Sequence, residues 1–221
     1  MTPQLPSFAE LAAAPDPPLD ALALALAAEF RDVDAVEALG RLDELGAELE
    51  GVVRTSATPL AEAQACAHLL GDRYGFAGDR ERYDHPDNSM LDLVLARRRG
   101  LPILLGVVYV EVARRAQIPI AGVGLPGHFV VGHFGAAPPV LLDPFAGGGI
   151  IATDADPSLL RPWPAQEIAM RMLNNLLAAF QRRADLGAAI CAAELRLALP
   201  AEEALRETLQ SEARALRARL N

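Results

Sequence analysis

The chain has 221 residues, of which 52% are hydrophobic, and its formal net charge is −9 at pH 7. Such a hydrophobic fraction is too high for a disordered chain, and the length is sufficient for one domain with a substantial core. The acidic balance argues against nucleic acid as a partner, because that binding needs clustered positive charge to replace counterions. The two cysteines are too far apart in sequence for a disulfide framework or a zinc ribbon.

The N-terminal segment lacks the pattern of a secretory signal or a membrane anchor. Its longest apolar run, residues 21–28, is too short to cross a bilayer and is followed by Glu29 and Arg31. We therefore expect a cytoplasmic protein that has no membrane partner.

The first 75 residues predict a series of helices. Ser7 and Glu10 have the spacing of a capping box, in which a serine and a glutamate three residues later close the start of a helix. Thr58 followed by a proline is a second start signal, and Gly71 is the expected end of that helix. Further helices are predicted over residues 19–30, 39–49 and 59–70.

The middle of the chain predicts a loop, a short helix and then a long buried helix. Residues 74–86 are rich in glycine and charged side chains and predict an ordered loop, after which Asn88 or Ser89 can cap a helix over residues 90–98. A helix over residues 102–116 is apolar on every side in its first two turns, which is typical of a buried helix.

Glu111 lies inside this apolar helix and needs a partner if it is buried. Arg114 is three residues further on and lies on the same side, so we expect a structural ion pair between them.

The hydrophobic period changes to two after the buried helix, which predicts three strands joined by glycine and proline. A hairpin loop over residues 135–139 connects the last two strands, and residues 147–149 form a flexible exit. The predicted strands cover residues 118–124, 128–134 and 140–145.

The C-terminal part predicts a linker over residues 157–164, in which Trp163 is docked, followed by helices over 166–184, 187–198 and 202–219. Ala188, Ala192 and Leu199 fall where a tetratricopeptide-type helix pair places such residues. One pair cannot form a stable array, so we favour a helical cap packed on the domain over a free repeat module. The chain is thus expected to have three parts, over residues 1–75, 76–150 and 151–221, packed as one compact unit.

His128 and Asp143 lie on adjacent strands of the predicted hairpin. If its loop is centred between residues 136 and 137, Val130 faces Asp143 and His128 is the diagonal neighbour on the same face, about 7–8 Å away between backbones. His133 then points to the other face. A histidine oriented by an aspartate is the base half of a nucleophilic triad, but it can equally be a structural hydrogen bond that fixes the hairpin. From the pairing alone we favour the structural interpretation.

Residues 83–89 form a dense polar segment that has two interpretations. Tyr83, Asp84 and Asn88 can line a cleft beside His128 and hold an amide or a peptide, or the segment can stabilise turns and cap the next helix. The residue pattern does not separate the two. Similarly, the arginines at 97–99 can bind an anion or an acidic partner, but we favour stabilisation of the helix C-terminus.

Five motifs together resemble the SirB-type transglutaminase-like family of bacteria, over about residues 8–149. They are residues 83–91 (YDHPDNSML), 98–103 (RRGLPI), 109–113 (YVEVA), 122–129 (GVGLPGHF) and 143–145 (DPF). The resemblance implies an α+β fold with a transglutaminase-like, papain-like core, in which the buried central helix packs against a small antiparallel sheet. It also implies N-terminal helices and a tetratricopeptide-like tail, which is shortened here.

The resemblance also exposes a missing group. In active members the nucleophilic cysteine stands at the start of the central helix, and the corresponding residue here is Pro102. His128 and Asp143 match the histidine and the aspartate of the family. Cys66 and Cys191 are expected to be free thiols that pack as small hydrophobic side chains.

Three hypotheses follow for the function. We favour a catalytically silent protein that binds a protein or peptide partner, with Tyr83, Asp84, Asn88 and Pro102 at the binding site, and we expect no cofactor. The alternative is a hydrolase or amidase in which His128 and Asp143 activate water. A metal site formed by His85, His128 and Asp143 is least favoured, because the spacing matches no standard motif.

Overall fold

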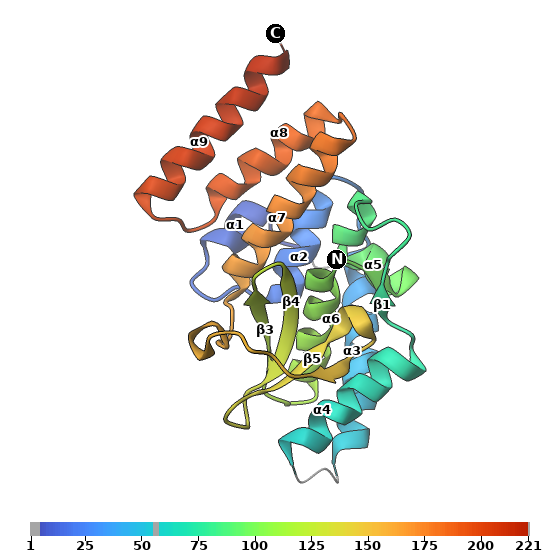
Figure 1. Cartoon of the computed structure of the whole chain (residues 1–221). Coiled ribbons are helices and arrows are strands. Elements are labelled where there is room, and N and C mark those ends of the chain that lie inside the picture. Colours follow the sequence, from blue (N-terminus) through green and yellow to red (C-terminus); the bar gives the residue numbers. More distant parts are fainter. Residues whose placement is uncertain (1–4, 55–57, 221) are drawn as a thin grey trace.

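The computed structural model describes residues 5–54 and 58–220. The N-terminal part of the chain contains four helices. The predicted capping box is present at the start of the first: the Glu10 amide donates to the Ser7 hydroxyl, and the Ser7 amide donates to the Glu10 carboxylate at 2.8 Å. The helices are α1 (Phe8–Ala13), α2 (Leu19–Ala28), α3 (Ala35–Val53) and α4 (Pro59–Ala67) (Figure 1).

Gly71 does not end the fourth helix, contrary to the prediction from sequence. The helix continues after α4 as a π-helical turn, His68–Arg73. The glycine serves a close approach instead, because a Cβ at residue 71 would lie 1.8 Å from the carbonyl oxygen of Gly147. This contact joins the N-terminal helices to the segment that follows β5 (Val140–Asp143).

The central segment contains α5 (Leu91–Arg97) and the buried α6 (Pro102–Arg115). The N-cap of α5 is Met90, and no side chain forms a capping hydrogen bond at this N-terminus. The predicted cap by Asn88 or Ser89 is therefore wrong, because both residues belong to a separate 3-10 turn, Pro86–Ser89. The loop before this turn contains β1 (Ala77–Gly78), which pairs in parallel with β2 (Arg99–Gly100).

A four-stranded antiparallel sheet follows α6, in the order β3-β4-β5-β6 (Figure 1). The three predicted strands are present, and a fourth forms where a flexible exit was predicted. Gly147 has a φ of +78°, which turns the chain so that Gly149 lies opposite Asp143. Besides β5, the strands are β3 (Ile120–Leu125), β4 (His128–His133) and β6 (Gly149–Ile151).

Phe129 connects the sheet to α6 and to the linker. Its ring lies against Gly106 of α6 and Gly122 of β3, where an added Cβ would approach it to 2.6 Å. Trp163 packs edge-on to the same ring, with 5.9 Å between centroids, and its amide donates to the Gly122 carbonyl at 2.9 Å. The prediction that Trp163 is docked is confirmed.

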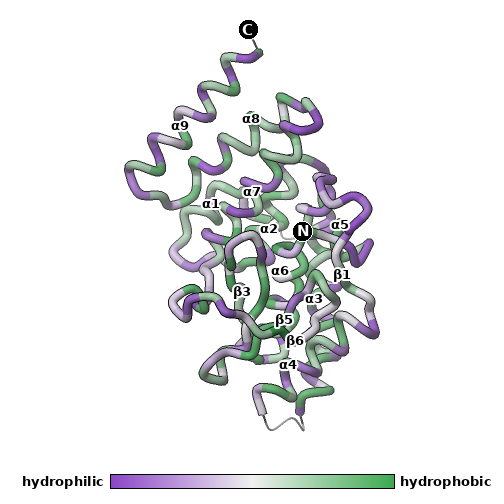
Figure 2. Tube along the Cα trace, in the orientation of Figure 1, coloured by the Kyte–Doolittle hydropathy of each residue, from purple (hydrophilic) through white to green (hydrophobic). Residues whose placement is uncertain are grey.

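Three helices form the tail: α7 (Ala165–Arg182), α8 (Leu186–Leu195) and α9 (Glu203–Arg217). α7 packs against α2 and α6, α8 against α7, and α9 against α8 (Figure 1). One hydrophobic cluster runs through all three parts of the chain, from Phe8 to Leu216. Figure 2 shows this hydrophobic character in α6 and the strands, whereas α9 alternates with hydrophilic residues. Within the described ranges, no helix combines the length and hydropathy that crossing a membrane requires.

A buried ionic cluster joins α6 to α2 and α3. The predicted pair is confirmed, since Nε of Arg114 donates to Glu111 at 2.9 Å. The neighbouring Arg115 also contacts Glu111 and Asp20, both at 2.7 Å, and Asp43 at 2.6 Å. Burial and the nearby Asp20 raise the pKa of Glu111. Burial also acts to raise the pKa of Asp20, but hydrogen bonds from Arg115 and from the Ala21 amide outweigh it and lower that pKa.

Candidate functional site

The hairpin register brings His128 and Asp143 together. Val131 pairs with Leu142, so Val130 lies opposite Asp143 and His128 is its diagonal neighbour, as predicted. Nε2 of His128 lies 3.0 Å from Oδ2 of Asp143, and the side chains are 33% and 16% exposed. The imidazole is therefore held by a carboxylate and is still accessible to solvent.

Asp143 also forms hydrogen bonds with the backbone that follows it. Its Oδ1 accepts hydrogen bonds from the amides of Phe145, at 2.9 Å, and Ala146, at 3.3 Å, and so caps the 3-10 turn Pro144–Ala146. The carboxylate is thereby fixed on both oxygens. Because Nε2 of His128 faces Asp143, a neutral imidazole that donates there presents Nδ1 as its basic nitrogen. Chemically, the pair can orient a general base.

The start of α6 offers this base no nucleophile. Pro102 occupies the first helical position, after the cap residue Leu101. It lies at the same end of the core as His128, because Phe129 packs on Gly106 one turn further along α6.

The two cysteines lie on other helices and are free. Cys66 of α4 is fully buried, and burial raises the pKa of its thiol to about 12. Burial also raises the pKa of Cys191 on α8. Both thiols are therefore protonated at neutral pH, which is the unreactive form.

The polar segment divides into exposed and buried residues. Tyr83 is 46% exposed, and its ring packs edge-on to Phe145 with 5.7 Å between centroids. Asp84 is exposed and pairs with Arg182 of α7 at 2.7 Å. With Leu101 and residues of α7, Tyr83 and Asp84 line a hollow of about 210 Å³.

Asn88 is fully buried and does not face this hollow. Its Nδ2 donates to the Arg82 carbonyl at 2.7 Å, and its Oδ1 accepts from Arg97 at 2.8 Å. The expectation that Asn88 lines a cleft is corrected by this geometry, because both ends of the amide are used to hold the loop.

Arg171 of α7 lies beside the histidine, and sequence reasoning missed it. Its Nη2 donates to the His128 carbonyl at 3.0 Å, and its guanidinium lies 5.7 Å from the ring centroids of both Phe129 and Trp163. Burial lowers the pKa of this arginine. No feature of the sequence marks Arg171, since one arginine on an amphipathic helix is ordinarily a solvated residue.

Arg171 also borders an apolar hollow of about 630 Å³ between α7, the linker and the start of α9. The residues that supply the apolar lining are Pro15, Trp163, Pro164, Met170, Pro200 and Leu205.

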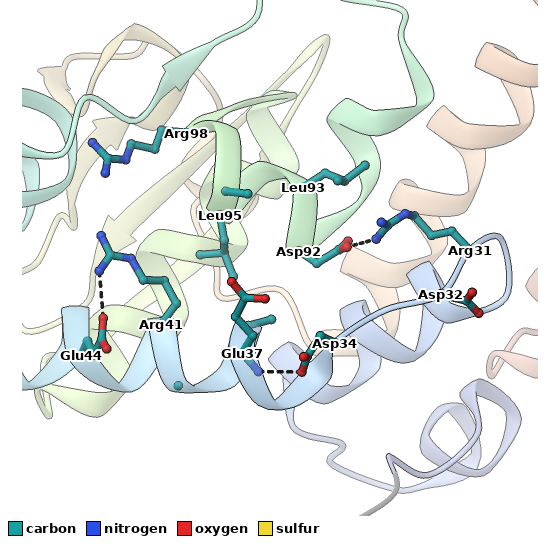
Figure 3. Close-up of a pocket in the computed structure, with 13 residues that line it drawn as sticks. Arg31, Asp32, Asp34, Glu37, Arg41, Glu44, Asp92, Leu93, Leu95 and Arg98 are labelled. Atoms are coloured by element: carbon teal, nitrogen blue, oxygen red, sulfur yellow. Dashed lines mark hydrogen bonds and ion pairs between the residues drawn. The ribbon is translucent and has the colours of Figure 1, made fainter.

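A different hollow, of about 890 Å³, lies between α3, α5 and the segment before α3 (Figure 3). Two of its three arginines pair with carboxylates of the hollow: Arg31 with Asp92, and Arg41 with Glu44 at 2.8 Å (Figure 3). Neither His128 nor any other residue of the candidate site lines it.

The structure does not assemble the metal site considered from sequence. Among the residues that it describes, no three or more His, Cys, Asp or Glu side chains are grouped so that they could hold a metal ion, which includes His85, His128 and Asp143. His133, on the other face of β4, contacts Glu62 at 2.7 Å and accepts at Nδ1 from the Gly135 amide.

The structure has a buried helix against an antiparallel sheet and a His–Asp pair across two neighbouring strands, as the resemblance to transglutaminase-like cores implies. The sequence matches the transglutaminase-like superfamily over residues 36–155, and the chain belongs to this superfamily.

Curated relatives extend the match. A UPF0162 protein of Xylella fastidiosa is 33% identical over 230 residues, which cover 92% of this chain and 80% of that protein. A UPF0162 protein of Pseudomonas aeruginosa is 34% identical over 148 residues, 66% of this chain and 53% of its own length. The F-box only protein 21 of Mus musculus is 35% identical over 81 residues, 37% of this chain and 13% of that protein. No solved structure matches the chain.

Proposed function

We propose that the protein is a catalytically silent, SirB-type transglutaminase-like protein that binds a peptide segment of a partner protein. Catalytic silence is supported by Pro102, which occupies the first position of α6, where the resemblance places the nucleophile. The His128–Asp143 pair is retained, with 3.0 Å between Nε2 of His128 and Oδ2 of Asp143. In this proposal α8 and α9 correspond to the shortened tetratricopeptide-like tail.

The apolar hollow beside Arg171 supports the binding of a peptide. A concave surface that is mostly apolar, with a small number of placed polar groups, is typical of ligand sites. Besides Gln166, Asn174 and Glu167, which pairs with Arg161, the polar group here is the Arg171 guanidinium, held by two aromatic rings and the His128 carbonyl. An arginine fixed in this way loses little conformational freedom when it binds a ligand.

The charge of Arg171 indicates which peptide fits. Over residues 5–54 and 58–220, no carboxylate forms an ion pair with it. A partly buried, unpaired cation is costly, and a ligand carboxylate would offset that cost through charge-assisted hydrogen bonds. We therefore infer that the peptide presents a carboxylate to Arg171 and an apolar side chain to Trp163 and Met170.

Replacing Arg171 with glutamine is expected to weaken peptide binding at least tenfold, since a hydrogen bond to a charged group contributes about 1.5–3 kcal/mol. Peptides with a free C-terminal carboxylate are selected from a library on the full chain, and their Kd values are measured with both proteins. C-terminally amidated copies of the same peptides should lose affinity for the wild type but not for Arg171→Gln.

Arg183→Gln is the matched control, because Arg183 is exposed just after α7 and its replacement removes the same charge. Peptides that bind Arg171→Gln as tightly as the wild type would contradict the proposed site.

The alternative function, a hydrolase or amidase that uses water, also has an observation in its favour. The 3.0 Å contact and the 33% exposure of His128 are what a general base requires. The two proposals separate by turnover, since a binding protein has none that depends on His128.

A further inference from the structure

Another concave surface lies beside the ring of Phe145 and carries an excess of positive charge. It has a volume of about 600 Å³ and is lined by β1, β2, the end of α5 and the loop after β1. Four arginines and two carboxylates line it, in a protein whose net charge is −9. The charged residues are Asp79, Arg80, Glu81, Arg82, Arg97 and Arg99.

Carboxylates pair with only two of these four arginines, Arg82 with Asp79 and Arg97 with Asp87. Asp79 is buried and accepts the Arg82 amide at 2.9 Å, while the nearest guanidinium nitrogen of Arg82 is 3.9 Å away. Among the described residues, Arg80 and Arg99 take part in no ion pair. Within the described part of the chain, two positive charges, of Arg80 and Arg99, and one negative charge, of Glu81, are thus left without an ion-pair partner at the hollow.

Three of the arginines are held by contacts with other residues. Arg97 donates to the fully buried Asn88 at 2.8 Å and lies 3.5 Å from Asp87. Arg80 stacks on the ring of Phe145, 5.5 Å from its centroid. The backbone of Arg99 is held by the parallel pairing of β1 with β2, and its guanidinium donates to the Gly75 carbonyl.

We propose that this hollow, which we call the arginine hollow, binds a small molecule that carries phosphate groups. The planar guanidinium fork matches the geometry of phosphate oxygens, and several forks around one hollow suit an anion with more than one charge. The hollow in Figure 3 differs in this respect, because its five carboxylates outnumber its three arginines, two of which are paired with them. The inference is independent of the peptide site at Arg171.

The proposal is tested by calorimetric titration of the full chain with inorganic pyrophosphate, adenosine triphosphate and citrate at low salt. Pyrophosphate is expected to bind, and a double variant, Arg80→Gln with Arg99→Gln, is expected to weaken it at least tenfold. A tighter Kd for adenosine triphosphate than for pyrophosphate would assign the ligand to nucleotides, and equal values would assign it to free phosphates.

A second double variant, Arg183→Gln with Arg214→Gln, is the matched control, since both residues are exposed on the tail helices and the net charge changes equally. It should leave the Kd for pyrophosphate unchanged. The proposal is overturned if pyrophosphate does not bind, if both double variants weaken it equally, or if citrate binds as tightly. Circular dichroism confirms that each variant is folded.

Discussion

Replacing Arg115 with leucine is expected to lower the free energy of unfolding by about 3–5 kcal/mol, because the change removes the more buried of the two arginines that contact the carboxylates of Asp20 and Glu111. The side chains of Asp20 and Glu111 are 5% and 2% exposed, and Arg115 contacts both at 2.7 Å. Their mutual repulsion would then act in a poorly solvated site between α2 and α6. Urea unfolding followed by circular dichroism measures the difference.

Arg114→Leu is the matched control within the same cluster. The Arg114 side chain is 57% exposed, so its ion pairs are screened by water and its loss should cost about 1 kcal/mol or less. Equal losses in the two variants would show that burial does not set the strength of this cluster.

Replacing Gly71 with alanine is expected to lower the free energy of unfolding by about 1–3 kcal/mol, the range for forced overpacking. The added Cβ would meet the backbone oxygen of Gly147 at 1.8 Å, and backbone cannot rotate away as a side chain can. Gly147 directly follows the turn that Asp143 caps, and the next amide, of Gly148, donates to the Asp143 carbonyl at 2.7 Å. The shift should therefore also alter the NMR signals of the His128 ring.

Gly40→Ala is the control for this substitution. Gly40 lies in α3, and an added Cβ there meets no atom within 4 Å. This variant should gain about 0.5–1 kcal/mol, since alanine is the better helix former. A neutral Gly71→Ala variant with an unchanged His128 signal would show that the approach to Gly147 does not hold the turn in place.

Much of the fold could be predicted because its signals are local. The Ser7–Glu10 capping box, the all-round apolar start of α6 and the centre of the hairpin loop each depend on a few neighbouring residues. The π-helical turn and β6 could not be predicted in this way. The π-helical turn lies where Gly71 meets Gly147 of a distant segment, and β6 requires the positive φ of Gly147 and pairing with β5.

The candidate site shows the same division. The closeness of His128 and Asp143 follows from strand register, which the sequence encodes through alternation and loop length. The sequence predicts Asn88 at a binding site, but the polarity of a side chain does not reveal whether a loop folds over it, and Asn88 is fully buried. Arg171 comes from a helix that packs across the start of β4, and that packing is a tertiary property.

The most direct test of the account is turnover by the wild type and by His128→Ala on a panel of amides and activated esters. If the protein is catalytically silent, the wild type and His128→Ala do not differ in rate and neither rate exceeds the buffer background. Wild-type turnover that falls about 10²-fold or more in His128→Ala, the typical contribution of a general base, would contradict catalytic silence and establish the hydrolase.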